Sequence, residues 1–298
     1  MFLNDVWDRY EELKPNIKRS SIDQIGYSVN AFEKWSETKR TVDEIDSEAL
    51  AEFARWRIKH VSPKTLSRNL SDVITLIRFA VRQLKIPMTV PYVEPVPVPR
   101  PIPTAWTVPE VSAMVARCQS LDGWMRNLPI RRSVWWVALI LFLYDSGSRI
   151  HAALSLDVND FDPQMRTATL RGEHAKTGYE QVVDLSPESV ESMQEVIAAS
   201  GNQTGPAFPW PWTHRKLWVD FHAIIGDAEV RGGRYVGFHR LRKTHATQQV
   251  IVHGWEHARV ALGHSTESMT RRYVDVRQIP RTPLSIPRPV IQKCKSSG

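Results

Sequence analysis

The feature that most restricts the fold of this 298-residue chain is a run of prolines between residues 87 and 103. They stand at positions 87, 91, 95, 97, 99, 101 and 103, and the last five alternate strictly. Proline has no backbone N–H and fixes φ at about −65°, so this stretch favours an extended strap over a helix. Since a chain of this length more often forms two domains than one, we predict a domain over residues 1–86, a linker over 87–106, a second domain over 107–279 and a tail over 280–298.

Helical spacing of apolar residues marks the segment before the strap. Ile22, Ile25, Val29, Phe32 and Trp35 recur every three or four residues. This period is typical of an amphipathic helix, with Ser20 or Ser21 as its expected N-cap. Further helices are predicted over residues 6–13, from Asp46 onward, and after Ser62, where proline follows at the first helical position. The first domain should therefore be all-helical.

Basic side chains collect on the predicted helix that follows Ser62. The face opposite its apolar residues carries Lys64, Arg68, Arg78, Arg82 and Lys85. Such a row can follow a phosphate backbone without reading sequence, and the formal net charge of +7 favours a polyanionic partner. A solvated charged face is the alternative interpretation. We predict that these five residues contact the phosphate backbone of a nucleic acid.

After the strap, Thr107 and Glu110 have the spacing of a capping box that opens a helix. The stretch from Val134 to Leu143 is apolar on nearly every helical face, which is typical of a helix buried in a large core. This helix should end at Gly147, with Arg149 just beyond it. A charged group so close to a core needs either a structural carboxylate or a bound anion.

Short runs of β-type residues interrupt the helical pattern at 167–170 and 181–185. A polar connection joins them, so we predict a hairpin with Lys176 near its tip. Ser186 before a proline then opens another helix. The expected class is mainly α with a small β-sheet or hairpin, which makes the second domain α+β.

The stretch from Phe238 to Val276 holds the densest group of chemically useful side chains. His239 and Arg242 are three apart in a helical segment and so share one face. His264 follows a Leu-Gly helix stop, and Tyr273 comes nine residues later. Gly254 and Gly263 bracket a short helix, and Ser265 is the expected cap of the next helix, which would carry Tyr273.

The two cysteines, Cys118 and Cys294, match no metal or disulfide spacing, which fits a reducing compartment. Acidic residues interrupt the apolar residues at the N-terminus, and no apolar run is long enough to span a membrane. We therefore expect a cytoplasmic protein with no membrane partner, associated with the nucleoid when it binds DNA.

Four stretches, in order, resemble the conserved boxes of the tyrosine recombinases, also called the phage integrase family. They are residues 144–150, residues 175–178, residues 239–246, and residues 262–265 with Tyr273. The resemblance covers residues 107–276 closely and the segment before the strap more loosely. It implies an N-terminal all-α, SAM-like core-binding domain followed by an integrase-type catalytic domain.

The resemblance also implies a chemistry, in which Tyr273 attacks a DNA phosphate and forms a 3′-phosphotyrosyl link. Arg149, Arg242 and His264 would stabilise the transition state, His239 would help remove the tyrosine proton, and Lys176 would protonate the leaving oxygen. No metal, other cofactor or ATP would be needed. The partners would be double-stranded DNA and, on synapsed DNA, three further copies in a homotetramer. Additional candidate DNA contacts are Arg240, Lys243, Arg271 and Arg272.

The sequence departs from the family pattern at two places. Three residues after the first arginine the family usually has an acid, and here that position is Ala152. This bears on how Arg149 or His239 is positioned. Prolines at 283, 287 and 289 disfavour a long C-terminal helix, so the tail would be either an extended docking segment or disordered.

Three other functions fit parts of the sequence. The five histidines between 239 and 264 suggest a metal hydrolase, but their spacing matches no zinc pattern. A non-catalytic DNA-binding relative would tolerate Ala152, although it has no need for all six catalytic-type residues. A relaxing topoisomerase would share the tyrosine chemistry.

Overall fold

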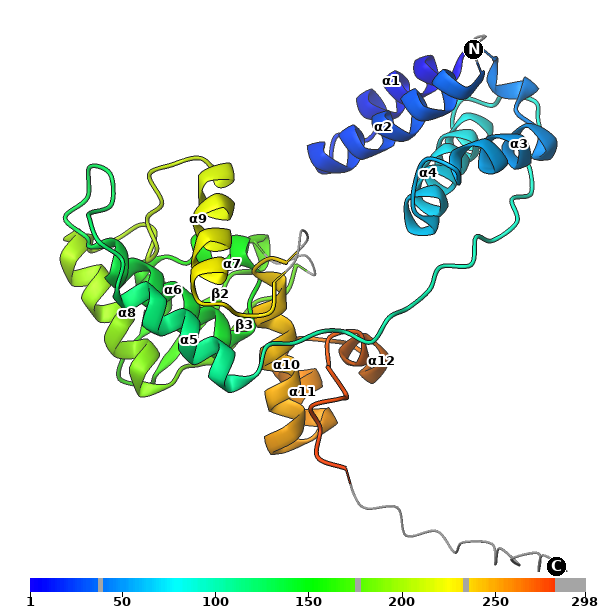
Figure 1. Cartoon of the computed structure of the whole chain (residues 1–298). Helices are drawn as coiled ribbons and strands as arrows, with labels where there is room; N and C mark the ends of the chain where they lie inside the picture. The colour runs from blue at the N-terminus through cyan, green and yellow to red at the C-terminus, as the bar shows by residue number, and fades with distance from the viewer. Residues whose placement is uncertain (37–39, 175–177, 233–235, 282–298) are drawn as a thin grey trace, which may run out of the picture. The chain divides into compact units, whose positions relative to one another are not determined.

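The computed structural model describes residues 1–36, 40–174, 178–232 and 236–281. The chain divides into two compact units, Met1–Arg100 and Pro101–Gly298 (Figure 1). Each unit has a hydrophobic core of its own. The division falls inside the proline strap. Helices dominate both units, and the second unit also contains a three-stranded sheet. The predicted class, mainly α with a small β-sheet, is confirmed.

The first unit is built from helices packed around one apolar cluster. They are α1 (Leu3–Leu13), α2 (Arg19–Ser36), the 3₁₀ turn η1 (Val42–Glu44), α3 (Ser47–Arg57) and α4 (Pro63–Arg82). The predicted caps of α3 and α4 are confirmed, because Asp46 accepts from the Ala49 N–H and Ser62 from the Thr65 N–H. The cap predicted for α2 is wrong: the helix begins at Arg19, so Ser20 and Ser21 lie in its first turn.

Helix α4 ends at Arg82, and Lys85 lies beyond it in a left-handed conformation with φ +57°. The Ile86 N–H donates back to the Ala80 carbonyl at 3.2 Å, which closes the helix end. The prediction that Lys85 continues the basic face of this helix is therefore wrong. The other four basic residues do lie on α4 and are exposed.

The proline strap contains neither helix nor strand from residue 88 to residue 106, as its prolines predict. Its first part packs on the core of the first unit through Met88, Val90, Val93 and Val96. Its last part, residues 103–106, hydrogen-bonds within the second unit. The predicted linker therefore has both ends fastened, each to its own unit.

The second unit surrounds α6 (Arg132–Ser146), which is buried on nearly all sides as predicted. Figure 1 shows α5 and α8 running alongside it. The other helices are α5 (Val108–Gln119), α7 (Ile150–Leu154), α8 (Pro187–Ser200), α9 (His214–Asp227), α10 (His239–His253), α11 (Trp255–Ala261) and α12 (Glu267–Arg271). Thr107 and Glu110 form the expected capping box of α5, and Gly147 stops α6 with φ +56°.

The sheet is antiparallel, in the order β1 (Phe161–Asp162), β2 (Thr167–Leu170), β3 (Gln181–Asp184). The predicted β2–β3 pairing is confirmed, with Leu170 opposite Gln181. Strand β1 was not predicted, because two residues carry no detectable period. The 3₁₀ turns η2 (Val158–Asp160) and η3 (Gly172–His174) lie in the connections.

Candidate active site

Arg242 is the buried centre of the site. It lies on the first turn of α10, and only 3% of its surface is exposed. Its guanidinium donates to the Gly147 carbonyl at 2.7 Å and to the Leu262 carbonyl at 2.9 Å. Burial and then repulsion from Arg149 lower the pKa of Arg242 to about 10, which leaves it protonated at neutral pH. Two main-chain carbonyls therefore aim this permanent donor.

His264 follows α11 at a turn where Gly263 has φ +63°, which favours glycine. Its Nε2 lies 3.2 Å from Nη2 of Arg242, and its Nδ1 lies 3.1 Å from the Thr270 hydroxyl oxygen. Because arginine only donates, Nε2 must be the acceptor and Nδ1 carries the proton. Burial, then Arg242 and Arg149, lower the pKa of His264 to about 4. The imidazole is neutral at pH 7.

Tyr273 lies against this pair. Its ring centroid is 4.9 Å from the His264 ring and 5.1 Å from the His239 ring, and the Arg242 guanidinium carbon is 5.3 Å from the Tyr273 ring centre. The structure brings together these four predicted site residues from one chain.

The expectation that a helix capped by Ser265 carries Tyr273 is wrong. Helix α12 ends at Arg271, and its N-cap position is Thr266, with no side-chain cap bond. The Tyr273 N–H still donates to the Thr270 carbonyl at 2.8 Å. Tyr273 therefore lies just past a helix of five residues, so other contacts must fix its position.

His239 is the first residue of α10 and remains open to solvent. Packing around its ring, followed by the positive charges of Lys243, Arg242 and Arg149, lowers its pKa to about 4. A neutral imidazole beside a tyrosine ring is in the state needed to accept a proton.

Arg149 lies at the N-cap position of α7, next to Arg242 and His264 in the wall of a hollow of about 380 Å³. The apolar part of the wall consists of Ala152, Leu170, Val182 and Val260, and Glu180 also lines the hollow. Within the described part of the chain, Arg149 has no carboxylate partner.

Two other wall residues carry buried polar atoms that lack a hydrogen bond within the described ranges, Ser148 Oγ and Arg242 Nε. Buried donors normally have a hydrogen-bond acceptor, so these two atoms are free to bind an acceptor group on a ligand. Together with Arg149 they make the hollow rich in hydrogen-bond donors. Such a hollow suits an oxyanion, because a hydrogen bond to an ionised group is stronger than one between neutral groups.

Ala152 leaves a methyl group where the family usually has an acid. The adjacent His151 does not replace it, because its ring packs on His214 at 5.0 Å. Arg242 is instead held by the Gly147 and Leu262 carbonyls. These contacts were not predicted, because main-chain acceptors leave no pattern in the amino-acid sequence.

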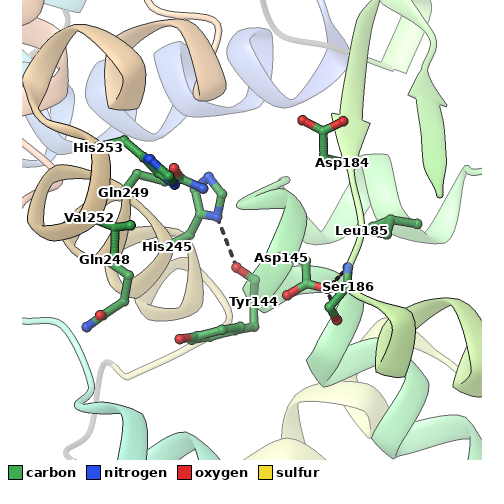
Figure 2. A pocket seen from close by; sticks show the side chains of 10 residues that line it. All are labelled: Tyr144, Asp145, Asp184, Leu185, Ser186, His245, Gln248, Gln249, Val252 and His253. Carbon is green, nitrogen blue, oxygen red and sulfur yellow. Dashed lines mark hydrogen bonds between the residues drawn. The ribbon is translucent and has the colours of Figure 1, made fainter. Parts of the chain in front are cut away.

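Figure 2 shows a second hollow, of about 360 Å³, which is lined by residues of α6 and α10 and by the segment from Asp184 to Ser186. His245 forms part of its wall, and its Nδ1 lies 3.0 Å from the Tyr144 carbonyl oxygen. Because a carbonyl oxygen only accepts, Nδ1 carries the proton and donates. A Cβ at Gly147 would fall 2.4 Å from His245 Cδ2. The imidazole thus packs directly under the turn whose carbonyl holds Arg242.

The candidate DNA contacts differ in their surroundings. Lys64, Arg78, Arg82 and Arg272 are exposed, whereas Arg68 is paired with the buried Asp72 at 2.9 Å. Arg240 donates to the Arg231 carbonyl and lies over Trp106, and Arg271 pairs with Glu267 and lies over Trp255. Lys243 is half-buried beside His239. Lys176 lies outside the described residues.

Nothing in the described ranges groups three or more His, Cys, Asp or Glu side chains as a metal site would require. His253 and His257, two of the five histidines that raised the metal alternative, pack ring against ring at 4.5 Å. Among the same described residues, no helix is long and apolar enough to cross a membrane.

Residues 110–278 match the model of the phage integrase family. Tyrosine recombinase XerD of Mycobacterium leprae is 28% identical over 275 residues, which are 84% of this chain and 83% of that protein. XerD of Mycobacterium tuberculosis H37Rv is 27% identical over 229 residues, 72% of this chain and 70% of that protein.

Solved structures share the fold at low identity. The Tn1549 transposon integrase with a circular intermediate DNA superposes with a TM-score of 0.71 at 16% identity, covering 92% of this chain and 95% of that one. A lambda integrase dimer bound to a COC′ core site gives 0.71 at 15%, covering 96% and 81%. The XerH recombinase bound to difH gives 0.71 at 17%, covering 91% and 79%.

Proposed function

Because the chain belongs to the phage integrase family, we propose that it is a site-specific tyrosine recombinase that cuts and rejoins double-stranded DNA. One observation carries this proposal more than any other. The ring of Tyr273 lies beside Arg242 and His264, and these two residues line a hollow in which two buried polar atoms lack a hydrogen-bond partner among the described residues. A nucleophile next to an oxyanion site is the arrangement that phosphoryl transfer requires.

The scissile phosphate would occupy the donor-rich hollow. Its non-bridging oxygens gain negative charge as the phosphorus becomes five-coordinate, and the guanidinium groups of Arg149 and Arg242 would stabilise that charge. Arg242 is already held in place by two carbonyls, so little reorganisation accompanies binding. Ser148 would supply a further hydroxyl donor.

The reaction exchanges one phosphate ester for another. The Tyr273 oxygen forms a bond to phosphorus, the bond to the 5′ oxygen breaks, and a DNA 3′-phosphotyrosyl link remains. His239 would take the tyrosine proton, and Lys176 would protonate the 5′ oxygen. Because the ester energy is kept in the covalent link, resealing needs no ATP, and the cationic side chains would do the work of a metal ion.

His264 has a role that depends on the phosphate. In the DNA-free site its Nε2 accepts from Arg242. A bound phosphate would take over that arginine donor, and its negative charge would raise the pKa of the imidazole. His264 would then donate to a phosphate oxygen.

The partners follow from the same proposal. One solved relative is a lambda integrase tetramer bound to a Holliday junction, with a TM-score of 0.72 to this chain. We expect this chain to act as a homotetramer on two synapsed duplexes. The exposed basic residues of α4, namely Lys64, Arg68, Arg78 and Arg82, would contact the phosphate backbone.

The test is a covalent trapping experiment. Binding sites are first selected from randomised duplexes by retention on the protein, and the selected duplex is then nicked so that cleavage cannot be reversed. Wild type should form a protein–DNA adduct on a denaturing gel in EDTA and without ATP, and Tyr273→Phe should form none. Tyr179→Phe is the matched control, because this exposed tyrosine lines the same hollow.

The outcomes separate the remaining functions. Tight binding without any adduct from wild type would favour the non-catalytic DNA-binding relative. An adduct together with relaxation of supercoiled DNA that lacks the selected site would favour the topoisomerase. Exchange of strands between two duplexes that both carry the site identifies the recombinase.

A further inference from the structure

The segment that follows Tyr273 contains a buried acid. Asp275 is only 1% exposed, and its neighbour Val274 is fully buried. Burying a carboxylate is costly unless it is paired and hydrogen-bonded. A charge kept inside the protein two residues after the proposed nucleophile therefore needs a reason.

The hydrogen bonds of Asp275 supply that reason. Its Oδ2 accepts from the Ala105 N–H of the strap at 3.2 Å, and its own N–H donates to the Thr247 hydroxyl on α10 at 2.9 Å. Arg277 donates to both carboxylate oxygens at 2.7 and 2.8 Å. The carboxylate of Asp275 thus joins the strap end to Arg277, and the main-chain N–H of the same residue ties this segment to α10.

Neighbouring residues strengthen the same junction. Arg277 also donates to the Pro103 carbonyl at 3.2 Å, and Gln278 donates to the Ala105 carbonyl at 3.1 Å. On the strap, the Trp106 N–H donates to the Thr244 hydroxyl of α10 at 2.9 Å. The end of the strap is therefore fastened to the helix that carries His239 and Arg242, and to the segment just after Tyr273.

Building on the proposed function, we propose that Asp275 is a positioning residue, which fixes Tyr273 at the phosphate site by tying residues 274–278 to the strap end and to α10. Helix α12 stops two residues before the tyrosine, so it does not hold the ring by itself. The tyrosine is instead held from both sides, by Thr270 before it and by the Asp275 junction after it. The strap end thereby becomes part of the support of the nucleophile.

The size of the effect follows from geometry. A misplacement of about 1 Å at a reacting atom costs a rate factor on the order of 10². Asp275→Ala should therefore slow single-turnover cleavage at saturating nicked DNA by about 100-fold, while the Kd for DNA changes by less than about 2-fold. Asp275→Asn keeps an acceptor for the Ala105 N–H, so it should recover part of the loss.

Two further variants guard against a general loss of stability. Gln278→Ala removes a contact to the strap but leaves the Asp275–Arg277 pair intact, and it should slow cleavage by about 3–10-fold. Asp227→Ala is the matched control, because it removes an arginine–aspartate pair at Arg117, on the surface between α5 and α9. It should leave the cleavage rate unchanged.

Amide hydrogen exchange of the DNA-free protein tests the junction without relying on catalysis. In Asp275→Ala, exchange should speed up in residues 103–106 and 272–278 and stay unchanged in α6. Unchanged exchange at the strap end would overturn the junction, whatever the enzyme does. If wild type forms no adduct, the proposed function fails, and the exchange result still decides the junction. A loss of rate matched by an equal loss of binding would overturn the positioning role.

Discussion

Nη2 of Arg242 lies 3.2 Å from Nε2 of His264, and both side chains are buried. This contact joins α10 to the turn after α11, and it fixes the tautomer of the histidine. Two main-chain carbonyls also hold Arg242. Its position therefore does not depend on His264, whereas the orientation of His264 depends on Arg242.

The fork of Arg242 should be irreplaceable. Arg242→Lys keeps the charge, but one ammonium group does not reach the Gly147 carbonyl, the Leu262 carbonyl and the phosphate together. We expect the single-turnover cleavage rate to fall by about 10²–10³-fold, and the free energy of unfolding to fall by about 1–3 kcal/mol because buried carbonyls lose donors. Stopped cleavage assays and urea melts measure the two effects. If the cleavage rate of Arg242→Lys is instead within about 5-fold of the wild-type rate, the forked guanidinium is not required.

The pH dependence should lack the usual histidine step. The pKa values of His239 and His264 are lowered to about 4, so both imidazoles are neutral from about pH 5 upward. Cleavage at limiting DNA, which reports the free enzyme, should stay constant down to about pH 5. Half-maximal cleavage near pH 6.5 would instead mean that the proton acceptor has an ordinary histidine pKa.

The same shifts set the direction of the stability change. The unfolded chain takes up protons on these imidazoles at a pKa of about 6.5, whereas the folded protein does so only near 4. Stability should therefore be full above about pH 6.5 and should decline as the pH falls toward 4. Replacing His264 by Gln should reduce that decline in thermal melts across the range. An unchanged slope in the variant would count against the burial of a neutral His264.

The turn at Gly147 should be sensitive for two reasons. Gly147→Ala introduces a Cβ at φ +56° and only 2.4 Å from His245 Cδ2. Gly201→Ala is the control, because Gly201 has φ +69° but open space around it. We expect a loss of about 1 kcal/mol for the control and a larger loss for Gly147→Ala, with slower cleavage only in the latter. Adding His245→Ala should relieve the clash, and strict additivity of the two changes would contradict this packing.

The basic face of α4 should appear in the salt dependence of DNA binding. Arg78→Ala and Arg82→Ala should each weaken binding about equally for all DNA sequences and reduce the slope of log K against log[salt] by about 1. Arg9→Ala serves as the control, because Arg9 is an exposed arginine on α1 paired with Glu12. Slopes identical to wild type would remove α4 from the DNA interface.

Local signals predicted much of the fold. Ser62 and Thr107 cap the helices expected of them, and Gly147 stops α6. Each of these is a contact within a few residues, which a sequence pattern can encode. Strand β1 and the end of α4 were not predicted correctly, because their lengths depend on pairing and packing with distant segments.

The candidate site divides in the same way. The identities of Arg149, His239, Arg242, His264 and Tyr273 followed from the resemblance to a family, and the structure groups them. What holds them did not follow, because the Gly147 carbonyl and the Asp275 junction join segments that are far apart in the sequence. Tyr273 was expected on a helix, and it lies beyond one.

The central claim is that Tyr273 forms the covalent link to DNA, and mass spectrometry of the trapped adduct tests it most directly. After trypsin and nuclease digestion, we expect a nucleotide on the five-residue peptide YVDVR, which runs from Tyr273 to Arg277. A nucleotide on any other tyrosine, or an unmodified YVDVR peptide in an isolated adduct, would contradict it.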